Sequence, residues 1–419
     1  MEELIKKNEK SSQKISRRDF ITKSSAAAAA FMIVPRYVLG GPGYTAPSDK
    51  INIAAIGVGG KGRSDIAAIA TENIVALCDV DDVKMFDTIK RAGEWAEEKG
   101  LSENPLTKVP RYKDFREMLD KQKDIDAVTV STPDHFHAVA AITAIKQGKH
   151  AFVQKPLTYS VDEAQKLSAA AKKAGVVTQM GNQGHAGEGI RLIGEWLKDG
   201  AIGEVREVHC WTNRPIWDTG MNRPAEIPSV PPTLDWNQWI GPAPFRPYHP
   251  DYAPWSWRAW CDFGTGALGD MGAHIFDIPY HTLKMDHPTS VFASSSKFNG
   301  ESWPVASTIY YEFPQRGSLP PVKLTWYDGG IMPSRPEGIE PGRRMGDGDG
   351  GIMFYGDKGM IMCGCYGRNP RLVPETSMKE YQRPPKTLSR SPGIHEEWVQ
   401  CIKESKQASS NFDYAARLT

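Results

Sequence analysis

Two residues with acid–base chemistry, Asp270 and His274, lie four positions apart in the segment DFGTGALGDMGAHIFD. On a helix this spacing places both side chains on the same face. A carboxylate beside an imidazole fixes the tautomer of the ring and stabilises its protonated form, as a general acid–base requires. Glycines at 264, 266 and 269 allow the backbone to approach a ligand closely. The alternative to an acid–base role is that Asp270 and His274 form a surface pair that stabilises the helix modestly.

A glycine-rich run, GVGGKG, is typical of a loop that binds a dinucleotide. It follows an apolar, β-branched strand pattern at residues 51–56 and precedes a helical pattern. Such glycines permit a tight turn and a close approach of the backbone to a pyrophosphate, and the helix N-terminus offers free N–H groups to the phosphates. The glycines expected at the cofactor are Gly57, Gly59, Gly60 and Gly62.

The next strand pattern, NIVALCD, ends at Asp79, 22 residues after Gly57. This is close to the spacing expected for a carboxylate that accepts hydrogen bonds from the adenosine ribose hydroxyls. The same carboxylate repels a 2′-phosphate, so the sequence predicts NAD rather than NADP as the cofactor. An ordinary glycine turn beside a solvated aspartate would not require strand, loop, helix and acid to occur in this order.

Strand and helix patterns continue to alternate as far as residue 180. The expected strands are DIDAVTVSTP, HAFVQKP and VVTQMG, with the helices HAVAAITAIKQG and SVDEAQKLSAAAKKAG between them. This order predicts a parallel sheet covered by helices on both faces, a Rossmann domain over residues 50–180. Ligands bind beyond the C-terminal ends of such strands, where Ser131, Thr132, Gln154 and Lys155 are expected.

Three segments together carry a resemblance to a known family: the glycine-rich loop, STPDHFHAVAAITAIKQGKHAFVQKP and DFGTGALGDMGAHIFD. From about residue 50 to its last residue the chain resembles the glucose–fructose oxidoreductase/inositol dehydrogenase (Gfo/Idh/MocA) family. In that family a strand ending Glu-Lys-Pro delivers a lysine to the nicotinamide and the substrate. The lysine here is Lys155, but Gln154 replaces the usual glutamate. Glutamine still accepts a hydrogen bond from a ribose hydroxyl, while it loses the charge.

The resemblance also implies catalytic roles for three side chains. His274 takes the proton from a sugar hydroxyl, Asp270 orients the imidazole, and Lys155 polarises the oxygen while hydride passes to C4 of the nicotinamide. Further candidates are His185 and Arg258 for the substrate and His137 for the cofactor.

Residues 181–419 differ in composition and are expected to form an α+β domain for substrate binding and oligomerisation. A helix and a strand precede a long segment rich in Pro, Trp and Tyr, and further strand patterns follow. They predict an open, mostly antiparallel sheet with one face on the substrate site. The other face is available to a second copy of the chain, because the family commonly pairs, so we expect a homodimer or tetramer.

Three finer expectations concern this second part. Most tryptophans of the long segment fill a core, and at most two contact a ligand. The late helix GIHEEWVQCIKESK returns to the first domain. Members of the family usually continue beyond NFDYAARLT, so we expect part of the C-terminal edge to be absent.

The first 45 residues have the three-part layout of an export signal followed by a linker. A charged start with Arg17 and Arg18 precedes an apolar run from about Ala26 to Val34, and small residues follow. The run is about half of the roughly 20 residues that a spanning helix needs, so no membrane span is expected in the mature form. The order SRRDFITK resembles a twin-arginine signal, which predicts a periplasmic protein exported after folding.

Composition limits the remaining classes of function. The 419 residues carry a net charge of +1, which gives no electrostatic case for nucleic acid, and 40% are hydrophobic, enough for substantial cores. Six cysteines are too few for a disulfide framework in a chain of this length, and their spacing predicts no metal site.

These observations together predict an exported, NAD-dependent oxidoreductase that acts on a hydroxyl group of a carbohydrate or polyol. A second enzyme hypothesis is an NAD-dependent glycosidase that oxidises one sugar carbon, eliminates the glycosidic bond and reduces the carbon again. A third is a periplasmic sugar-binding protein without catalysis. The joint presence of Lys155, Asp270 and His274 argues against the third, because binding alone requires none of them.

Overall fold

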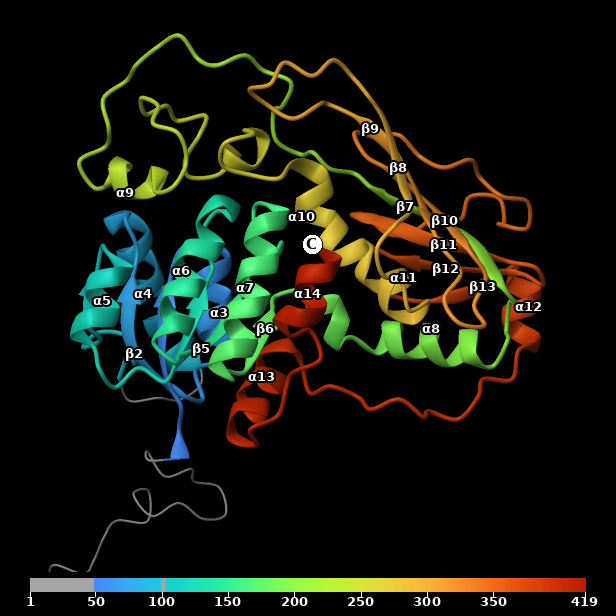
Figure 1. Ribbon diagram of the computed structural model, residues 1–419, viewed down its shortest axis with the longest axis horizontal. Helices are drawn as coiled ribbons and strands as arrows, with labels where there is room; N and C mark the ends of the chain where they lie inside the picture. Colours follow the sequence, from blue (N-terminus) through green and yellow to red (C-terminus); the bar gives the residue numbers. More distant parts are fainter. Residues whose placement is uncertain (1–48, 99–102) are drawn as a thin grey trace, which may run out of the picture. The chain divides into compact units, whose positions relative to one another are not determined.

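The computed structural model describes residues 49–98 and 103–419 (Figure 1). The expected twin-arginine signal and linker, residues 1–45, lie outside the described residues. Residues Ile51–Thr419 form one unit with two sheets, which belong to the expected Rossmann and α+β parts. In the part of the chain that the structure describes, every helix is too short or too polar to cross a membrane.

The first sheet is a six-stranded parallel sheet in the order β3-β2-β1-β4-β5-β6, which confirms the predicted Rossmann topology. The order reverses between β1 and β4, and dinucleotides bind at the C-terminal strand ends beside such a reversal. Its strands are β1 (Asn52–Ile56), β2 (Asn73–Cys78), β3 (Arg111–Tyr112), β4 (Ala127–Val130), β5 (His150–Val153) and β6 (Thr178–Met180).

Five helices connect these strands. Local sequence sets their ends: α7 begins with a capping box in which Ser160 and Glu163 exchange hydrogen bonds, and Gly175 ends it in the left-handed conformation. Helix α6 begins at Asp134, three residues before the predicted helix, which brings two further polar residues into its first turn. The helices are α3 (Lys61–Ala68), α4 (Asp82–Glu98), α5 (Phe115–Lys121), α6 (Asp134–Lys146) and α7 (Val161–Ala174).

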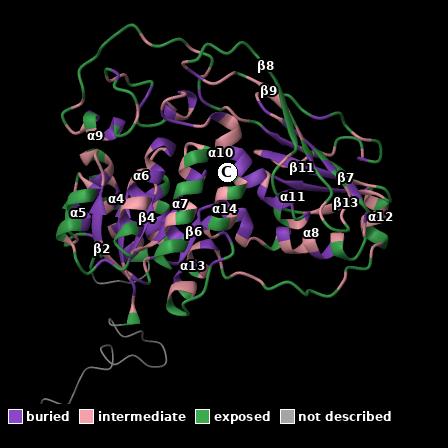
Figure 2. Ribbon diagram, in the orientation of Figure 1, coloured by how far each residue is buried: buried purple, intermediate pink, exposed green. Residues whose placement is uncertain are grey.

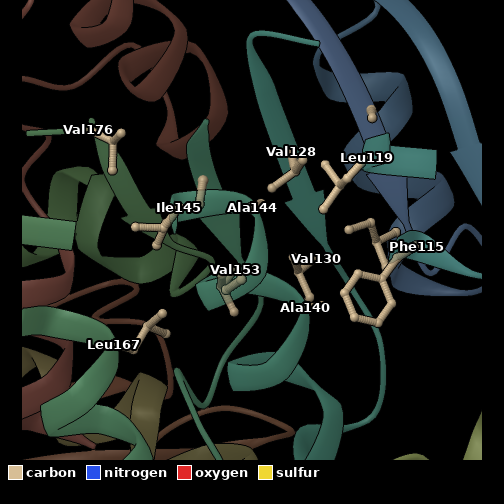
Figure 3. Close-up of a cluster of buried hydrophobic side chains, with 14 of the residues drawn as sticks. Phe115, Leu119, Val128, Val130, Ala140, Ala144, Ile145, Val153, Leu167 and Val176 are labelled. Carbon is tan, nitrogen blue, oxygen red and sulfur yellow. The ribbon is translucent and has the colours of Figure 1, made fainter. Parts of the chain in front are cut away.

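The core of the first part lies between this sheet and the helices α5, α6 and α7 (Figure 3). Val128, Val130 and Val153 extend from β4 and β5 toward apolar side chains of the helices, among them Leu119 and Ile145. All five side chains are at most 1% exposed. This packing fixes the C-terminal ends of β4 and β5, where the candidate cofactor residues lie.

The second sheet has seven strands in the order β13-β12-β11-β7-β10-β9-β8. Among the described strands of this second sheet, only the pair β7 and β10 is parallel. The sheet is therefore mixed and mostly antiparallel, as predicted. Its strands are β7 (Val205–Thr212), β8 (Ser290–Ser295), β9 (Ser307–Phe313), β10 (Val322–Tyr327), β11 (Gly350–Gly356), β12 (Met360–Gly364) and β13 (Arg371–Val373).

One face of this sheet is covered by three helices that carry much of the second core. Apolar side chains of α8 (Glu188–Lys198), α10 (Gly266–Ile275) and α11 (Asp277–Thr282) pack with buried residues of β7, β10, β11 and β12. Figure 2 shows the mixture of buried and exposed residues along these elements. Helix α10 carries both Asp270 and His274, so this packing orients the predicted acid–base pair.

The long aromatic segment forms a core of its own. It contains α9 (Trp236–Ile240) and the 3-10 turn η3 (Ser256–Ala259). Trp255 is 55% exposed, whereas the other tryptophans of the segment are buried. The expectation that most of them fill a core is confirmed. The buried tryptophans of this cluster are Trp217, Trp236, Trp239, Trp257 and Trp260.

The last two long helices return to the first sheet. Trp398 of α13 (Ile394–Lys403) packs with Ile53 of β1 and Phe152 of β5, as expected for the late helix. Phe412 of α14 (Phe412–Leu418) joins the core of the first part, which the sequence did not indicate. The expected boundary at residue 180 therefore separates the two sheets, but α13 and α14, which lie after it in the sequence, contribute to the core of the first part. A short helix, α12 (Glu375–Glu380), follows β13, and a 3-10 turn, η2 (Gln183–Ala186), follows β6.

Replacing Trp398 by alanine tests how far this return stabilises the fold. The indole is fully buried, so Trp398→Ala should lower the free energy of unfolding by about 3–5 kcal/mol. Trp255→Ala is the matched control and should change it by less than about 1 kcal/mol, because this indole is mostly exposed. Urea unfolding followed by tryptophan fluorescence measures both. Equal changes in the free energy of unfolding for the two variants would contradict the packing of α13 on the first sheet.

Candidate active site

The glycine-rich loop joins β1 to α3 at the reversal of strand order. Gly57 has a positive φ of 77°, and a Cβ on Gly62 would lie only 1.9 Å from the carbonyl oxygen of Gly57. Gly60 has a φ of 50°, and a Cβ there would meet no described atom within 4 Å, so the loop is open at this position. A Cβ added to Gly59 would lie 3.0 Å from the side chain of Lys84. The loop thus needs glycine for its own folding and leaves its backbone accessible to a phosphate.

Asp79 lies directly behind this loop, at the end of β2. Its Oδ2 accepts hydrogen bonds from the backbone N–H groups of Val58 (2.8 Å) and Gly59 (3.3 Å), and its Oδ1 accepts one from Asp81 (3.0 Å). Burial raises the pKa of Asp79, and these three N–H groups oppose the rise. Because Oδ1 accepts a single bond, it retains a lone pair for a ribose hydroxyl.

The ends of β4 and β5 place three more predicted residues near the loop. The Ser131 hydroxyl donates to Asp65 (2.7 Å), and the Gln154 amide nitrogen donates to the same carboxylate (2.9 Å). The hydroxyl of Thr132 and the amide oxygen of Gln154 are buried without a hydrogen-bond partner among the described residues. Buried polar atoms without a partner are rare in proteins, and here they fit the hydroxyl and amide groups of a nicotinamide riboside.

Lys155 follows Gln154 and connects the two sheets. Its Nζ donates to the Asp270 side chain at 2.7 Å and to the Asp270 backbone oxygen at 2.7 Å. The two side chains are only 16% and 13% exposed. The structure therefore brings Lys155 and Asp270 together, as the resemblance implied, and fixes the lysine nitrogen in one position at the strand end.

Two arginines complete the charges around Asp270. Arg258, which was predicted, lies 3.4 Å from Oδ1, and Arg214, which no motif in the sequence marks, lies 3.9 Å from Oδ2. Burial raises the pKa of Asp270, but Lys155 and Arg258 outweigh it and lower the pKa to about 2. Arg258 also stacks on Trp255 and Trp257 at 4.8 and 4.2 Å. An ionised carboxylate here neutralises cations that would otherwise repel one another.

His274 lies one turn after Asp270 on α10 and is only 2% exposed. Its Nδ1 is buried without a partner among the described residues, and its ring packs edge-on against Tyr366 at 4.8 Å. Burial, and then the positive charge of Lys155, lower the pKa of His274 well below its ordinary value. The ring is therefore neutral near pH 7 and can accept a proton. The hydrogen bonds of the Asp270 carboxylate go to Lys155 and Arg258, so Asp270 acts on His274 through its charge.

A contact that the sequence did not reveal holds α10 in place. The Asp134 carboxylate, at the start of α6, accepts hydrogen bonds from the backbone N–H (3.1 Å) and the hydroxyl (2.6 Å) of Thr265. A Cβ on Gly269 would lie 1.9 Å from the Thr265 hydroxyl oxygen. Gly269, which the sequence suggested would let the backbone approach a ligand, therefore leaves room for the Thr265 side chain that contacts Asp134. The aspartate in the first turn of the STPDHFH helix was the available signal.

Two of the predicted histidines are occupied by structural contacts. The His137 nitrogens lie 2.8 Å from the Pro156 carbonyl oxygen and 2.9 Å from that of Thr132, so the ring braces the two strand-end loops. His185 is 1% exposed, and its Nδ1 bonds the buried Asp277 at 2.8 Å. Their predicted contacts with cofactor and substrate remain predictions, and both residues lie in the supports of the site.

A cavity of about 730 Å³ lies on the opposite face of α10 from Asp270 and His274. It is lined by residues of α10, α7 and α14, among them Leu268, Gly269 and Leu418, and by none of the predicted catalytic, cofactor-binding or substrate-binding residues. The candidate active site is therefore defined by the chemistry at the strand ends rather than by this cavity.

Comparison with known proteins agrees with this geometry. The chain matches two models of one family: the oxidoreductase family with an NAD-binding Rossmann fold (Gfo/Idh/MocA) over residues 51–182, and the C-terminal alpha/beta domain of this oxidoreductase family over residues 204–313. Together they cover more than half of the chain. The fold is that of this oxidoreductase family with its NAD-binding Rossmann domain, and the protein belongs to the Gfo/Idh/MocA family.

Individual curated relatives match shorter parts of the chain. A glycosyl hydrolase family 109 protein of Solibacter usitatus is 33% identical over 124 residues, 29% of this chain and 27% of the relative. A levoglucosan dehydrogenase of Pseudarthrobacter phenanthrenivorans is 26% identical over 166 residues, 39% of this chain and 34% of the relative. The chain thus spans about a third of the length of these curated relatives.

Among solved structures, the WlbA dehydrogenase from Bordetella pertussis, in complex with NADH and UDP-GlcNAcA, superposes with a TM-score of 0.58. The match covers 88% of this chain and 93% of that chain, with 14% identity. At this identity the likeness shows the fold alone.

The lowered pKa of Asp270 predicts a pH dependence of stability. The folded pKa of about 2 lies below the ordinary 3.8, so the ionised carboxylate stabilises the fold above about pH 4, and the effect is lost as the pH falls through 2. The shift corresponds to about 2 kcal/mol. Asp270→Asn should therefore be less stable than the wild type at pH 5, by a margin that shrinks toward pH 2. Urea unfolding over this range measures the margin, and a pH-independent difference would contradict the assignment.

Proposed function

We propose that this protein is an NAD-dependent oxidoreductase that oxidises a secondary hydroxyl group of a carbohydrate or polyol. One observation carries the proposal: at the C-terminal edge of the parallel sheet, the Nζ of Lys155 is held by Asp270, one helical turn before the buried, neutral His274. A cation next to an unprotonated base is the pair that removing a proton from an alcohol requires. The levoglucosan dehydrogenase among the relatives supports the class of substrate.

The cofactor is held by residues of this chain as follows. The glycine loop and the N-terminus of α3 would hold the pyrophosphate, Asp79 would hold the adenosine ribose, and Gln154 and Thr132 would bind the nicotinamide riboside. The bound NAD⁺ supplies the hydride acceptor at C4 of its nicotinamide. A negative charge at Asp79 disfavours a 2′-phosphate, so the site suits NAD better than NADP.

The chain's own residues handle the proton and the developing charge. Lys155 donates a hydrogen bond to the reacting oxygen and stabilises its negative charge as the O–H bond breaks. The His274 imidazole takes the proton, and the negative charge of the Asp270 carboxylate stabilises the imidazolium that forms. The alcohol becomes a ketone: the C–H bond yields a hydride to NAD⁺, the O–H bond yields a proton to His274, and a C=O double bond forms. Arg258 and Arg214 border the site and suit further hydroxyl groups.

A second function is favoured by relatives that are named glycosyl hydrolase family 109 proteins. In that case oxidation of a ring carbon acidifies the neighbouring C–H, and the glycosidic bond breaks by elimination. Water then adds to the double bond, and the hydride returns to the carbonyl carbon. The net reaction is hydrolysis, with NAD⁺ restored.

The two functions are separated by their products. The purified protein is given panels of free sugars, polyols and aryl glycosides, and nicotinamide absorbance and released phenol are followed together. Oxidation of a free sugar supports the dehydrogenase, whether it yields NADH or an equal amount of a reduced second sugar detected by product analysis. Release of phenol with no net NADH supports the glycosidase. Neither an oxidised sugar nor released phenol over the whole panel would contradict catalysis and favour a sugar-binding protein.

Alanine substitutions test the catalytic residues. Lys155→Ala and His274→Ala should each lower kcat at least about a hundredfold, the scale of lost acid–base catalysis. NAD binding should persist in His274→Ala, because the ring lies on α10 rather than on the cofactor loop. The matched control is Lys149→Ala, whose Nζ donates to the Ile125 carbonyl oxygen within the same domain. Turnover close to wild type in either active-site variant would mean that the residues are wrongly assigned.

We propose that the protein works in the periplasm after export by the twin-arginine route and carries its dinucleotide with it. The motif around Arg17 and Arg18 supports this. Free NAD is scarce outside the inner membrane, so an exported enzyme needs a cofactor that stays bound. It must also regenerate that cofactor on the protein, by reducing a second sugar or by closing the glycosidase cycle.

Retention of the cofactor is directly testable. The purified protein should contain roughly one dinucleotide per chain after gel filtration and should turn over without added NAD, which corresponds to nanomolar affinity and about −12 kcal/mol. Native mass spectrometry measures the occupancy. A cofactor-free preparation that needs added NAD for every turnover would contradict both tight binding and the rationale for export.

We further propose that the chain forms a homo-oligomer through its second sheet. All six residues of the edge strand β8 are exposed, and Val291 and Phe292 are 56% and 66% exposed. Exposed apolar side chains on an edge strand favour pairing with another copy.

A further inference from the structure

Asp65 is a buried carboxylate beneath the cofactor loop, and the mechanism above does not use it. It lies in α3, three residues after Gly62, and its side chain is fully buried. Four side chains from four segments of the chain donate to it. They are Lys61 at 3.0 Å, Ser131 at 2.7 Å, Gln154 at 2.9 Å and His395 at 2.9 Å.

These donors keep the Asp65 carboxylate ionised. Burial raises its pKa, but the hydrogen bond from His395 and the charge of Lys61 outweigh burial, so the pKa lies below its ordinary value. An ionised carboxylate only accepts hydrogen bonds. Every group that faces Asp65 must therefore present a hydrogen to it.

This requirement sets the orientation of the Gln154 amide. The Gln154 nitrogen lies 3.0 and 2.9 Å from the two Asp65 oxygens, so it is the amide oxygen that turns away from Asp65. That oxygen is buried and has no partner in the part of the chain that the structure describes. Gly181 gives the amide room, since a Cβ there would lie 2.7 Å from the Gln154 nitrogen. The result is one buried acceptor of fixed direction at the C-terminal end of β5.

We propose that Asp65 is a positioning residue for the cofactor: it orients Gln154 so that the amide oxygen accepts a hydrogen bond from the nicotinamide ribose. The inference rests on the proposed function for the identity of the ligand. It also explains why glutamine occupies the position where a glutamate was expected. A glutamate at 154 would place a second carboxylate within about 3 Å of Asp65, and like charges at this distance repel strongly in a buried site.

The simpler explanation is that Asp65 only docks α13 through His395. The chain offers a matched case, because Glu72 is another buried carboxylate that binds α13. It accepts hydrogen bonds from Lys403 of α13 (2.7 Å) and from the backbone N–H of Ile51 (2.7 Å). Since these bonds of Glu72 do not involve Gln154, a purely structural role predicts the same consequences for both acids.

A charge swap separates the two explanations. NAD affinity is measured by calorimetric titration of charcoal-treated protein, for the wild type, Gln154→Glu, Asp65→Asn, the double variant and Glu72→Gln. Thermal unfolding of each variant shows that it is folded. Gln154→Glu and Asp65→Asn should each weaken NAD binding roughly tenfold or more, because the first sets two carboxylates together and the second releases the amide. The double variant should bind within about threefold of the wild type, since the introduced asparagine amide can donate to the introduced glutamate.

The outcomes bear on distinct claims. Recovery of affinity in the double variant, with Glu72→Gln changing stability but not NAD affinity, supports positioning by Asp65. Wild-type affinity in Gln154→Glu, or losses in the double variant that multiply those of the single variants, would overturn it. So would an NAD affinity that Glu72→Gln and Asp65→Asn lower alike. A wild-type protein that binds no NAD at all would instead contradict the proposed function.

Discussion

The buried ion pair between Lys155 and Asp270 is the interaction on which the arrangement of the site depends. It joins the end of β5 in the first sheet to α10, which packs on the second sheet. Removing two charges from water is costly, so such a pair contributes little net stability compared with apolar packing. Its value lies in geometry: the lysine nitrogen is held by two acceptors at 2.7 Å, and a substrate oxygen can compete for it without a rearrangement of the backbone.

Several apolar and polar contacts make that pair possible. The valines of β4 and β5 fix the strand ends, Asp134 holds the start of α10 through Thr265, and His137 braces the loops on either side. The return of α13 and α14 to the first sheet then joins the cores of the two parts. Reacting groups lose rate when they are misplaced by about 1 Å, and this many independent restraints on a few strand ends limit the movement of the candidate site.

Much of the fold was predictable because its signals are local. Alternating strand and helix patterns indicated the Rossmann topology, and the spacing of Asp270 and His274 placed both on α10. What could not be predicted depends on contacts between distant segments. Arg214 reaches Asp270 and Asp134 reaches Thr265 across the fold, and no periodicity or spacing marks either pair. For the same reason, the occupation of His137 by backbone carbonyls was not visible in the sequence.

The glutamine at 154 shows how a departure from a family pattern acquires a physical cause only in three dimensions. In the sequence it is a lost charge, 89 residues from Asp65. In the structure the carboxylate belongs to Asp65, whose charge is balanced by Lys61 and which accepts a hydrogen bond from His395. With the carboxylate on Asp65, residue 154 carries a neutral amide, and the positive charge of Lys155 is balanced by its ion pair with Asp270. Burial and then the charge of the same lysine lower the pKa of His274, so the ion pair of Lys155 with Asp270 and the neutral state of this candidate base belong to one electrostatic arrangement.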